Sequence, residues 1–176
     1  YWPNLHQSIQ TYINSCEICQ KTKYDRNPLK PEMNLTPTAS KPFQIIHIDM
    51  ITFDKTKFLT VIDLFSKYAQ AYPLESNTAI ELVDKMLIFM SHHGVPETII
   101  SDNGGEMRSA LFKEFLELHK IKIHFISSQH PSSNEVIERF HSTLVEHVRL
   151  LNNQEEFRKD SIKSKIRYAI IAYNCT

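Results

Sequence analysis

Residues 43–51 read FQIIHIDMI, and this apolar run marks the start of the main domain. A short run rich in isoleucine predicts a strand. One carboxylate, Asp49, lies inside it between Ile48 and Met50. Burying a carboxylate costs free energy unless another group compensates its charge. The strand therefore points to a compensating partner for Asp49.

After this strand, short apolar runs alternate with helical periodicity. The sequence predicts strands at about 58–64, 68–74, 97–101 and 121–126, and helices at about 78–93, 109–119, 134–151 and 160–174. Thr78 and Glu81 match a capping box at the start of the first of these helices, and Gly94 ends it. Three closely connected strands followed by helix–strand alternation predict an α/β fold, a mixed five-stranded sheet flanked by helices.

The front of the chain differs from this domain. Residues 5–20 have helical spacing, whereas residues 21–42 are basic and contain four prolines, as linkers do. No signal peptide is expected, and no apolar run reaches the roughly 20 residues of a membrane span. Three cysteines favour a reducing compartment over a disulfide framework. The chain lacks an initiator methionine, so we expect a fragment of a longer polypeptide.

The charge distribution is uneven although the formal net charge is zero. Residues 1–42 carry five basic and three acidic groups, residues 43–152 carry ten and fourteen, and residues 153–176 carry five and three. Zero net charge argues weakly against nucleic acid as a partner. An acidic middle fits a core that binds cations, and it fits an ordinary mixed surface equally well.

Two further acids occur where a shared site is expected. Asp102 ends the strand TIISD, and Gly104 and Gly105 follow it, which suits a sharp turn. Glu138 lies in the long helix, with 35 residues between it and Asp102. Oxygen ligands at strand ends and helix starts suit two magnesium or manganese ions and metal-assisted phosphoryl transfer. Asp63, in the similar run VIDLF, is an alternative on composition alone.

Six segments of the chain resemble the integrases of gypsy-type LTR retrotransposons, which are related to retroviral integrases. The segments are YWPNLHQSIQTYINSCEICQKTK, PFQIIHIDMI, TVIDLFSKYAQAYPL, HGVPETIISDNGGEM, HPSSNEVIERFHSTL and AIIAYN. Their order and spacing agree with the family throughout, including the 35-residue gap, and they cover nearly the whole chain.

The resemblance implies three segments. Residues 1–24 would be a truncated HHCC-type zinc-binding segment and residues 25–42 a linker. Residues 43–176 would be an RNase H-like catalytic core that is truncated at its C-terminal end.

The resemblance also implies an activity and its residues. It assigns a magnesium- or manganese-binding triad to Asp49, Asp102 and Glu138, and it makes Asp63 a non-catalytic position. The implied enzyme performs DNA 3′-end processing and strand transfer: a water, then a DNA 3′-hydroxyl, attacks a phosphodiester without a covalent enzyme intermediate. The implied partners are double-stranded DNA and further copies of the chain, with no membrane. The implied location is nuclear, after passage through the cytoplasm, and the protein is not secreted.

Cys16 and Cys19 form a CxxC motif, which occurs both in zinc sites and in redox pairs. Here it ends a helical pattern, whereas a redox pair normally opens a helix after a strand. Structural zinc takes four ligands, and the resemblance implies two histidines upstream of Tyr1 as the other two. His6 does not match a ligand position of the family.

Polar residues around the long helix are the candidates for DNA contact, with solvated surface as the alternative for each. The candidates are Gln129, Ser133, Asn134, Arg139 and His141. The lysines that some retroviral relatives carry one and two turns past the glutamate are replaced by Ser142 and Val145.

One position departs from the family pattern, because Glu135 stands where glycine is usual. Glu135 would stiffen the preceding loop, repel DNA, or form a capping box with Ser132. A domesticated, non-catalytic protein that binds nucleic acid or another protein is therefore an alternative function. Among enzymes the alternative is a generic RNase H-like nuclease, which the CxxC motif and the linker disfavour.

We predict that this chain does not bind zinc tightly, because Cys16 and Cys19 supply half of a four-ligand site. Metal analysis of the purified protein should find well under one zinc per chain. About one zinc per chain, lost on Cys16→Ser substitution, would contradict this expectation.

Overall fold

The computed structural model describes residues 2–16, 38–76, 78–102, 104–126 and 135–175. The chain divides into two compact units, Tyr1–Leu35 and Thr36–Thr176. Within the described parts, no helix combines the length and the apolar character needed to cross a membrane.

The helices and strands lie close to their predicted positions. They are α1 (Leu5–Ser15), β1 (Ile45–Phe53), β2 (Thr56–Asp63), β3 (Ala69–Leu74), α3 (Ala79–His93), β4 (Thr98–Ser101), α4 (Ala110–Leu118), β5 (Lys122–Phe125), α5 (Glu135–Asn153) and α6 (Ile162–Asn174). Among the described residues, two short 3-10 helices, η1 (Glu106–Arg108) and η3 (Glu155–Phe157), were not predicted. Each spans three residues, too few for a periodic pattern to show.

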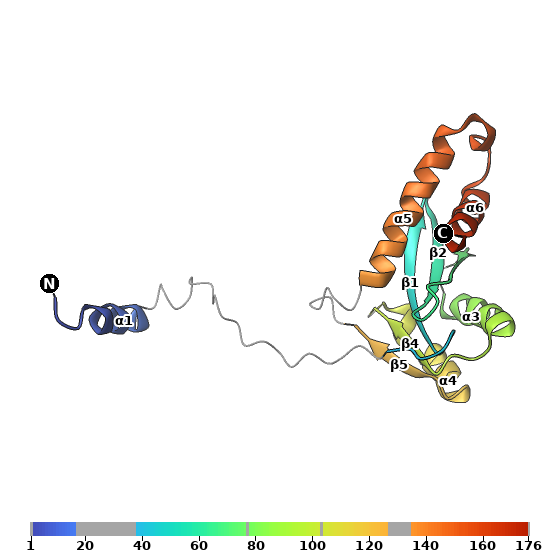
Figure 1. The fold of residues 1–176 in the computed structure, drawn as a ribbon. Helices are drawn as coiled ribbons and strands as arrows, with labels where there is room; N and C mark the ends of the chain where they lie inside the picture. The colour runs from blue at the N-terminus through green and yellow to red at the C-terminus, as the bar shows by residue number, and fades with distance from the viewer. Residues whose placement is uncertain (1, 17–37, 77, 103, 127–134, 176) are drawn as a thin grey trace. The chain divides into compact units, whose positions relative to one another are not determined.

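The strands form one mixed sheet in the order β3-β2-β1-β4-β5, which confirms the predicted α/β architecture (Figure 1). β1, β2 and β3 pair antiparallel, and β4 and β5 join in parallel. β1 is thus the central strand, and its first four residues, 45–48, are buried.

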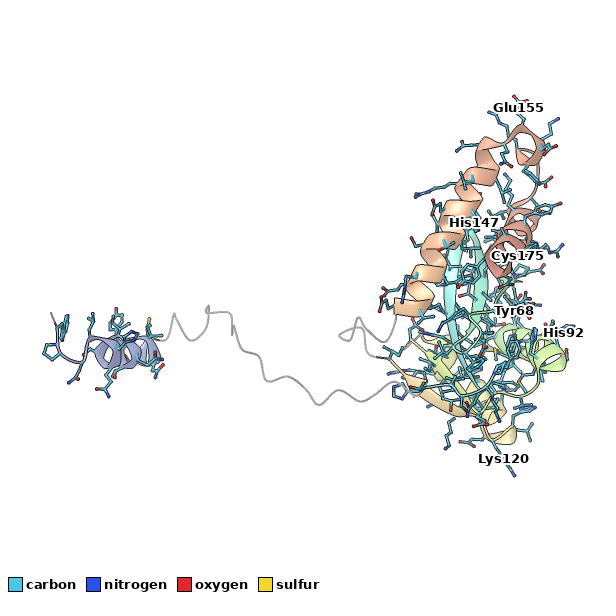
Figure 2. All side chains as sticks on the ribbon, in the orientation of Figure 1. Tyr68, His92, Lys120, His147, Glu155 and Cys175 are labelled. Carbon is cyan, nitrogen blue, oxygen red and sulfur yellow. The ribbon has the colours of Figure 1, made fainter. Side chains whose placement is uncertain are left out.

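Side chains that alternate along β1 build two separate cores. Ile46 and Ile48 are fully buried with apolar residues of α3 and α4. Ile51 and Phe53 pack with apolar residues of α5 and α6. Figure 1 shows α5 and α6 alongside the sheet. Figure 2 labels His147 of α5 and Glu155 of the connection between α5 and α6. The face of β1 that carries Asp49 is therefore the face that α5 covers.

Asp63 is fully buried at the end of β2, where it supports the backbone. Its Oδ1 accepts a hydrogen bond from the Phe43 N–H at 2.9 Å. Its Oδ2 accepts from the Ser66 N–H at 2.8 Å and from the Ser66 hydroxyl at 2.6 Å. Phe43 has φ 57°, a left-handed conformation that is costly for a bulky residue. The Asp63 carboxylate thus holds a strained start of β1 and the β2–β3 turn in place.

The caps of α3 follow the predicted pattern with one difference. Thr78 accepts a hydrogen bond from the Glu81 N–H at 3.3 Å, and Gly94 ends the helix with φ 85°. The Glu81 carboxylate accepts from the N–H groups of Glu75 and Ser76 at 2.6 and 2.8 Å, further back than the capping box requires. Glu81 therefore fixes the connection from β3 to α3 as well as the start of the helix.

The two outer strands of the sheet are short or interrupted. β3 contains Pro73, which has no N–H to donate to a further strand. The Asn174 side chain at the end of α6 accepts from the Ala69 N–H at 2.8 Å and donates to the Ala69 carbonyl at 2.9 Å. β5 is four residues long. Because β3 lies at the edge of the sheet, it tolerates Pro73.

The helix of the front unit, α1, has mostly exposed side chains. α1 ends at Ser15, and the predicted helix to residue 20 extends beyond the described residues. α1 contains no buried residue, and Leu5 and Ile9 are 44% and 49% exposed. A helix of 11 residues is marginal in water without packing, which is a physical reason for its early end.

We expect Asp63→Ala to destabilise the domain by about 2–3 kcal/mol, because it removes a buried acceptor and leaves the N–H groups of Phe43 and Ser66 without their hydrogen-bond partner. Urea unfolding checks this value. Asp84→Ala, at an exposed position of α3, is the matched control and should stay within about 0.5 kcal/mol of wild type. Equal effects of the two substitutions would contradict the assigned role of Asp63.

We expect Glu81→Gln to destabilise the domain in a pH-dependent way. Burial acts to raise the pKa of Glu81, but the hydrogen bonds from Glu75 and Ser76 outweigh it and lower the pKa below 4.5. A lowered pKa in the folded state gives stability above the unfolded-state pKa and loses it as pH falls. The deficit should be about 0.5–1 kcal/mol at pH 7.

That deficit should shrink as the pH falls below 4.5, measured by urea unfolding from pH 7 to pH 3. Glu114→Gln, at an exposed position of α4, is the control and should match wild type within about 0.5 kcal/mol. A deficit that stayed constant with pH would argue against the hydrogen-bonded carboxylate.

Candidate active site

Asp49, the first acid of the predicted triad, lies on β1 just beyond its pairing with β4. That parallel pairing ends with Ile48 opposite Ser101, so Asp49 and the residue after Ser101 come next on the two strands. On the other side, Asp49 lies opposite Thr60 of β2. The Asp49 side chain is 22% exposed, and its Oδ1 accepts from the Met50 N–H at 2.7 Å. The carboxylate is thus held at the end of a parallel pair, where α/β sheets bind ligands.

Asp102, the second acid, directly follows β4 and is exposed. Its Oδ1 accepts a hydrogen bond from the Gly104 N–H at 3.1 Å, which closes a tight turn. A Cβ at position 104 would lie 3.2 Å from that oxygen, whereas a Cβ at Gly105 would meet nothing within 4 Å. Of these two glycines, Gly104 is therefore the one where an added Cβ would crowd the Asp102 carboxylate.

Glu138, the third acid, is exposed in the first turn of α5. Its helix is held by the neighbouring buried residues Ile137 and Phe140. Burial raises the pKa of Asp49, the Met50 N–H lowers it, and the charges of Asp102 and Glu138 raise it further, giving about 6. The three predicted acids therefore lie close enough to interact electrostatically.

The chemistry of this group fits a hard divalent cation. Carboxylate oxygens are preferred ligands of magnesium and manganese, and a bound cation would offset the repulsion that raises the pKa of Asp49. Among the described side chains, no three or more His, Cys, Asp or Glu are gathered closely enough to hold one ion. The oxygen donors of the three acids are of the kind that magnesium and manganese prefer.

A histidine and a threonine complete the surroundings of Asp49. The Thr60 hydroxyl donates to the Asp49 carbonyl at 2.9 Å, and the Thr60 oxygen lies 2.8 Å from His141 Nε2. His141 Nδ1 lies 3.8 Å from Asp49 Oδ2, and the His141 side chain is 16% exposed. Burial lowers the pKa of His141 to about 4, so the ring is neutral at pH 7 and this approach is not an ion pair.

The sequence pattern did not predict that Thr60 and His141 lie beside Asp49. The pattern predicts a DNA contact for His141, and the structure places the His141 ring between α5 and the strands, next to Asp49. It assigns no role to Thr60, whose partnership with Asp49 depends on the β1–β2 register. His47, also unassigned, is 1% exposed, and its Nε2 has no hydrogen-bond partner among the described residues. Burial and nearby His141 lower the pKa of His47 to about 4.

An open pocket of about 460 Å³ lies along α5 next to these groups. Its lining residues are His141, Ser142, Val145, Glu146 and Arg149. His141 thus belongs both to the surroundings of Asp49 and to this pocket.

The other candidate DNA contacts divide into two groups. Gln129, Ser133 and Asn134 lie outside the described residues, as does Ser132 of the possible capping box. Arg139 is exposed and forms an ion pair with Glu135 at 3.3 Å, within the first turns of α5. Glu135, the residue in place of the usual glycine, therefore begins the helix and engages a nearby basic side chain.

The CxxC motif is described at its first residue alone. Cys16 follows α1 with an extended backbone. Cys19 lies outside the described residues. The ligand geometry of the predicted zinc half-site is therefore not visible.

Comparison with known proteins identifies matches to both parts of the chain. Residues 39–131 match the integrase core domain family, and residues 1–25 match the integrase zinc binding domain family. The Retrovirus-related Pol polyprotein from transposon gypsy of Drosophila melanogaster is 33% identical over 178 residues. The corresponding polyprotein from transposon opus of the same species is 30% identical over 154 residues.

The gypsy alignment covers 100% of this chain and 17% of that polyprotein, and the opus alignment covers 88% and 15%, so the chain spans about a sixth of each polyprotein.

Among solved structures, the HTLV-2 integrase catalytic core domain in complex with magnesium has a TM-score of 0.60 and 21% identity, covering 73% of this chain and 84% of that one. A simian T-cell lymphotropic virus intasome chain has a TM-score of 0.67 and 19% identity, and the match covers 93% of this chain and 59% of that one.

The structural matches confirm the expected RNase H-like integrase fold. The family match spans more than half of the chain, and the two polyproteins are similar across nearly all of it. The chain therefore belongs to the integrase family, in the branch found in the Pol polyproteins of gypsy-type retrotransposons.

Proposed function

We propose that this chain carries the active site of a DNA-joining enzyme that processes DNA 3′ ends and transfers them to target DNA. The observation that carries the proposal is the shared electrostatic environment of Asp49, Asp102 and Glu138. Three carboxylates that repel one another are stabilised by bound cations. The membership of the integrase family supports the same chemistry.

Each acid has a defined part in this proposal. Asp49 would bind both of two magnesium or manganese ions, Asp102 one of them and Glu138 the other. This division would give each ion two carboxylate ligands, with water and substrate oxygens completing its coordination. When bound, the ions activate the attacking oxygen and stabilise the charge that develops at the phosphodiester.

The surroundings of Asp49 suit this task. The Met50 N–H fixes one carboxylate oxygen, so the side chain is oriented before a cation binds. The open pocket along α5 provides room for a nucleic acid strand next to the acids, with Arg149 at its far end as a candidate phosphate contact. Asp63 has no part in the chemistry because its oxygens accept hydrogen bonds from Phe43 and Ser66.

The partners and location follow from the family. We propose double-stranded DNA as substrate, self-association of the chain and a nuclear site of action. Similar structures are named as a dimeric core domain and as an intasome, which supports self-association. The match of residues 1–25 to a zinc binding domain supports Cys16 and Cys19 as zinc ligands in the intact protein.

We expect Asp49→Asn, Asp102→Asn and Glu138→Gln each to abolish joining of a labelled DNA end to a target duplex in the presence of Mn²⁺. The loss should be on the order of a hundredfold or more, because losing even an outer partner of a metal ligand costs about 10–100-fold. Gel electrophoresis of the joined products measures it.

Asp84→Asn, an exposed acid on α3, is the matched control and should join DNA like wild type. A wild-type protein that binds DNA but forms no joined product at any Mn²⁺ concentration would favour the non-catalytic binder instead. Cleavage of DNA–RNA hybrids without joining would favour a generic nuclease.

A further inference from the structure

We propose that His141 is a positioning residue that, through Thr60, fixes the first turn of α5 against the strand that carries Asp49. The distance between Glu138 and Asp49 is then set by a hydrogen-bonded link and not by apolar packing alone. This inference rests on the proposed function of the two acids as metal ligands.

The link consists of two short hydrogen bonds. A hydroxyl has one proton to donate, and the Thr60 hydroxyl donates it to the Asp49 carbonyl at 2.9 Å. The bond of 2.8 Å between Thr60 and His141 is then donated by the Nε2–H of the histidine. The hydrogen bonds therefore run from His141 on α5 to Thr60 on β2, and from Thr60 to the backbone carbonyl of Asp49 on β1.

The link is largely enclosed: its Thr60 end is buried, and its His141 end borders the open pocket along α5. Thr60 is fully buried, and the His141 side chain is 16% exposed. Hydrogen bonds are stronger in a low-dielectric interior, and an unpaired polar group there is costly. Either partner alone would be left with an unsatisfied group, so α5 is held where both bonds form.

Helix geometry transmits this restraint to Glu138. His141 follows Glu138 by three residues, and residues three apart are neighbours on a helix surface. The rise between them is about 4.5 Å. A helix that is fixed at His141 therefore has little freedom at Glu138.

The link leaves the Asp49 carboxylate available for a cation. It ends on the Asp49 carbonyl, and His141 Nδ1 stays 3.8 Å from Asp49 Oδ2, too far for a hydrogen bond. The histidine therefore acts on the position of the two acids and not by occupying the oxygens that would bind metal.

The test measures Mn²⁺ binding by isothermal titration calorimetry on the full chain, together with DNA joining. His141→Phe keeps the ring volume and removes both nitrogens, and Thr60→Val removes the hydroxyl without changing the shape. Each should weaken Mn²⁺ binding about tenfold or more, as loss of an outer-sphere partner does. Because both residues belong to one link, the double variant should lose little more than either single variant.

His147→Phe is the matched control, since His147 lies on the same helix and contacts the Ala169 carbonyl at 3.4 Å (Figure 2). It should bind Mn²⁺ like wild type. His141→Gln and Thr60→Ser retain a donor and a hydroxyl, and should recover most of the lost affinity. These two milder variants also decide the question if His141→Phe or Thr60→Val fails to fold, as monitored by circular dichroism.

Wild-type Mn²⁺ affinity in His141→Phe and Thr60→Val would overturn the inference, and so would additive losses in the double variant or equal losses in His147→Phe. The two proposals fail separately. Mn²⁺ binding that depends on Asp49 and His141, with no joined product, refutes the enzyme and supports the link. If DNA joining and Mn²⁺ binding are both unchanged in His141→Phe, the link is refuted and the enzyme is supported. If the wild-type protein binds no Mn²⁺, both proposals are refuted.

Discussion

The candidate site depends on one constraint, the parallel pairing of β1 with β4. The pairing ends at Ile48 and Ser101, so the next residue on each strand is an acid at the same end of the sheet. The antiparallel partner β2 continues past this point and keeps Asp49 partly enclosed. The result is a half-buried carboxylate next to a solvated one, a combination that raises the pKa of the first and favours a cation.

Asp49 and Asp63 show why this site had to be seen in space. Both follow apolar residues in strands of the same sheet, and composition alone does not distinguish them, whereas the resemblance to the integrases does. Asp63 receives three hydrogen bonds from Phe43 and Ser66, which satisfy its charge. Asp49 receives a backbone hydrogen bond from Met50 and faces two other acids. The number of donors supplied by the fold separates a structural carboxylate from a candidate metal ligand.

Local features were predictable, and features that depend on register were not. Isoleucine-rich runs located the strands, and Thr78 and Gly94 located the ends of α3, because these signals act over a few residues. The positions of β1 and β4 along the chain were predicted, but their pairing side by side was not. The contact of Thr60 with His141 spans 81 positions and depends on how α5 lies across two strands. No short-range pattern contains that information.

The two margins of the sheet bear on how copies of the domain can associate. Pro73 leaves a gap in the donor row of β3, and β5 offers four residues. Edge-to-edge addition of a foreign strand needs a long, uninterrupted ladder of backbone groups. Contacts between copies through the described strands are therefore disfavoured as continuous β-structure. Copies of the domain would then associate through helical or loop surfaces, which can separate and re-form without breaking hydrogen bonds between strands.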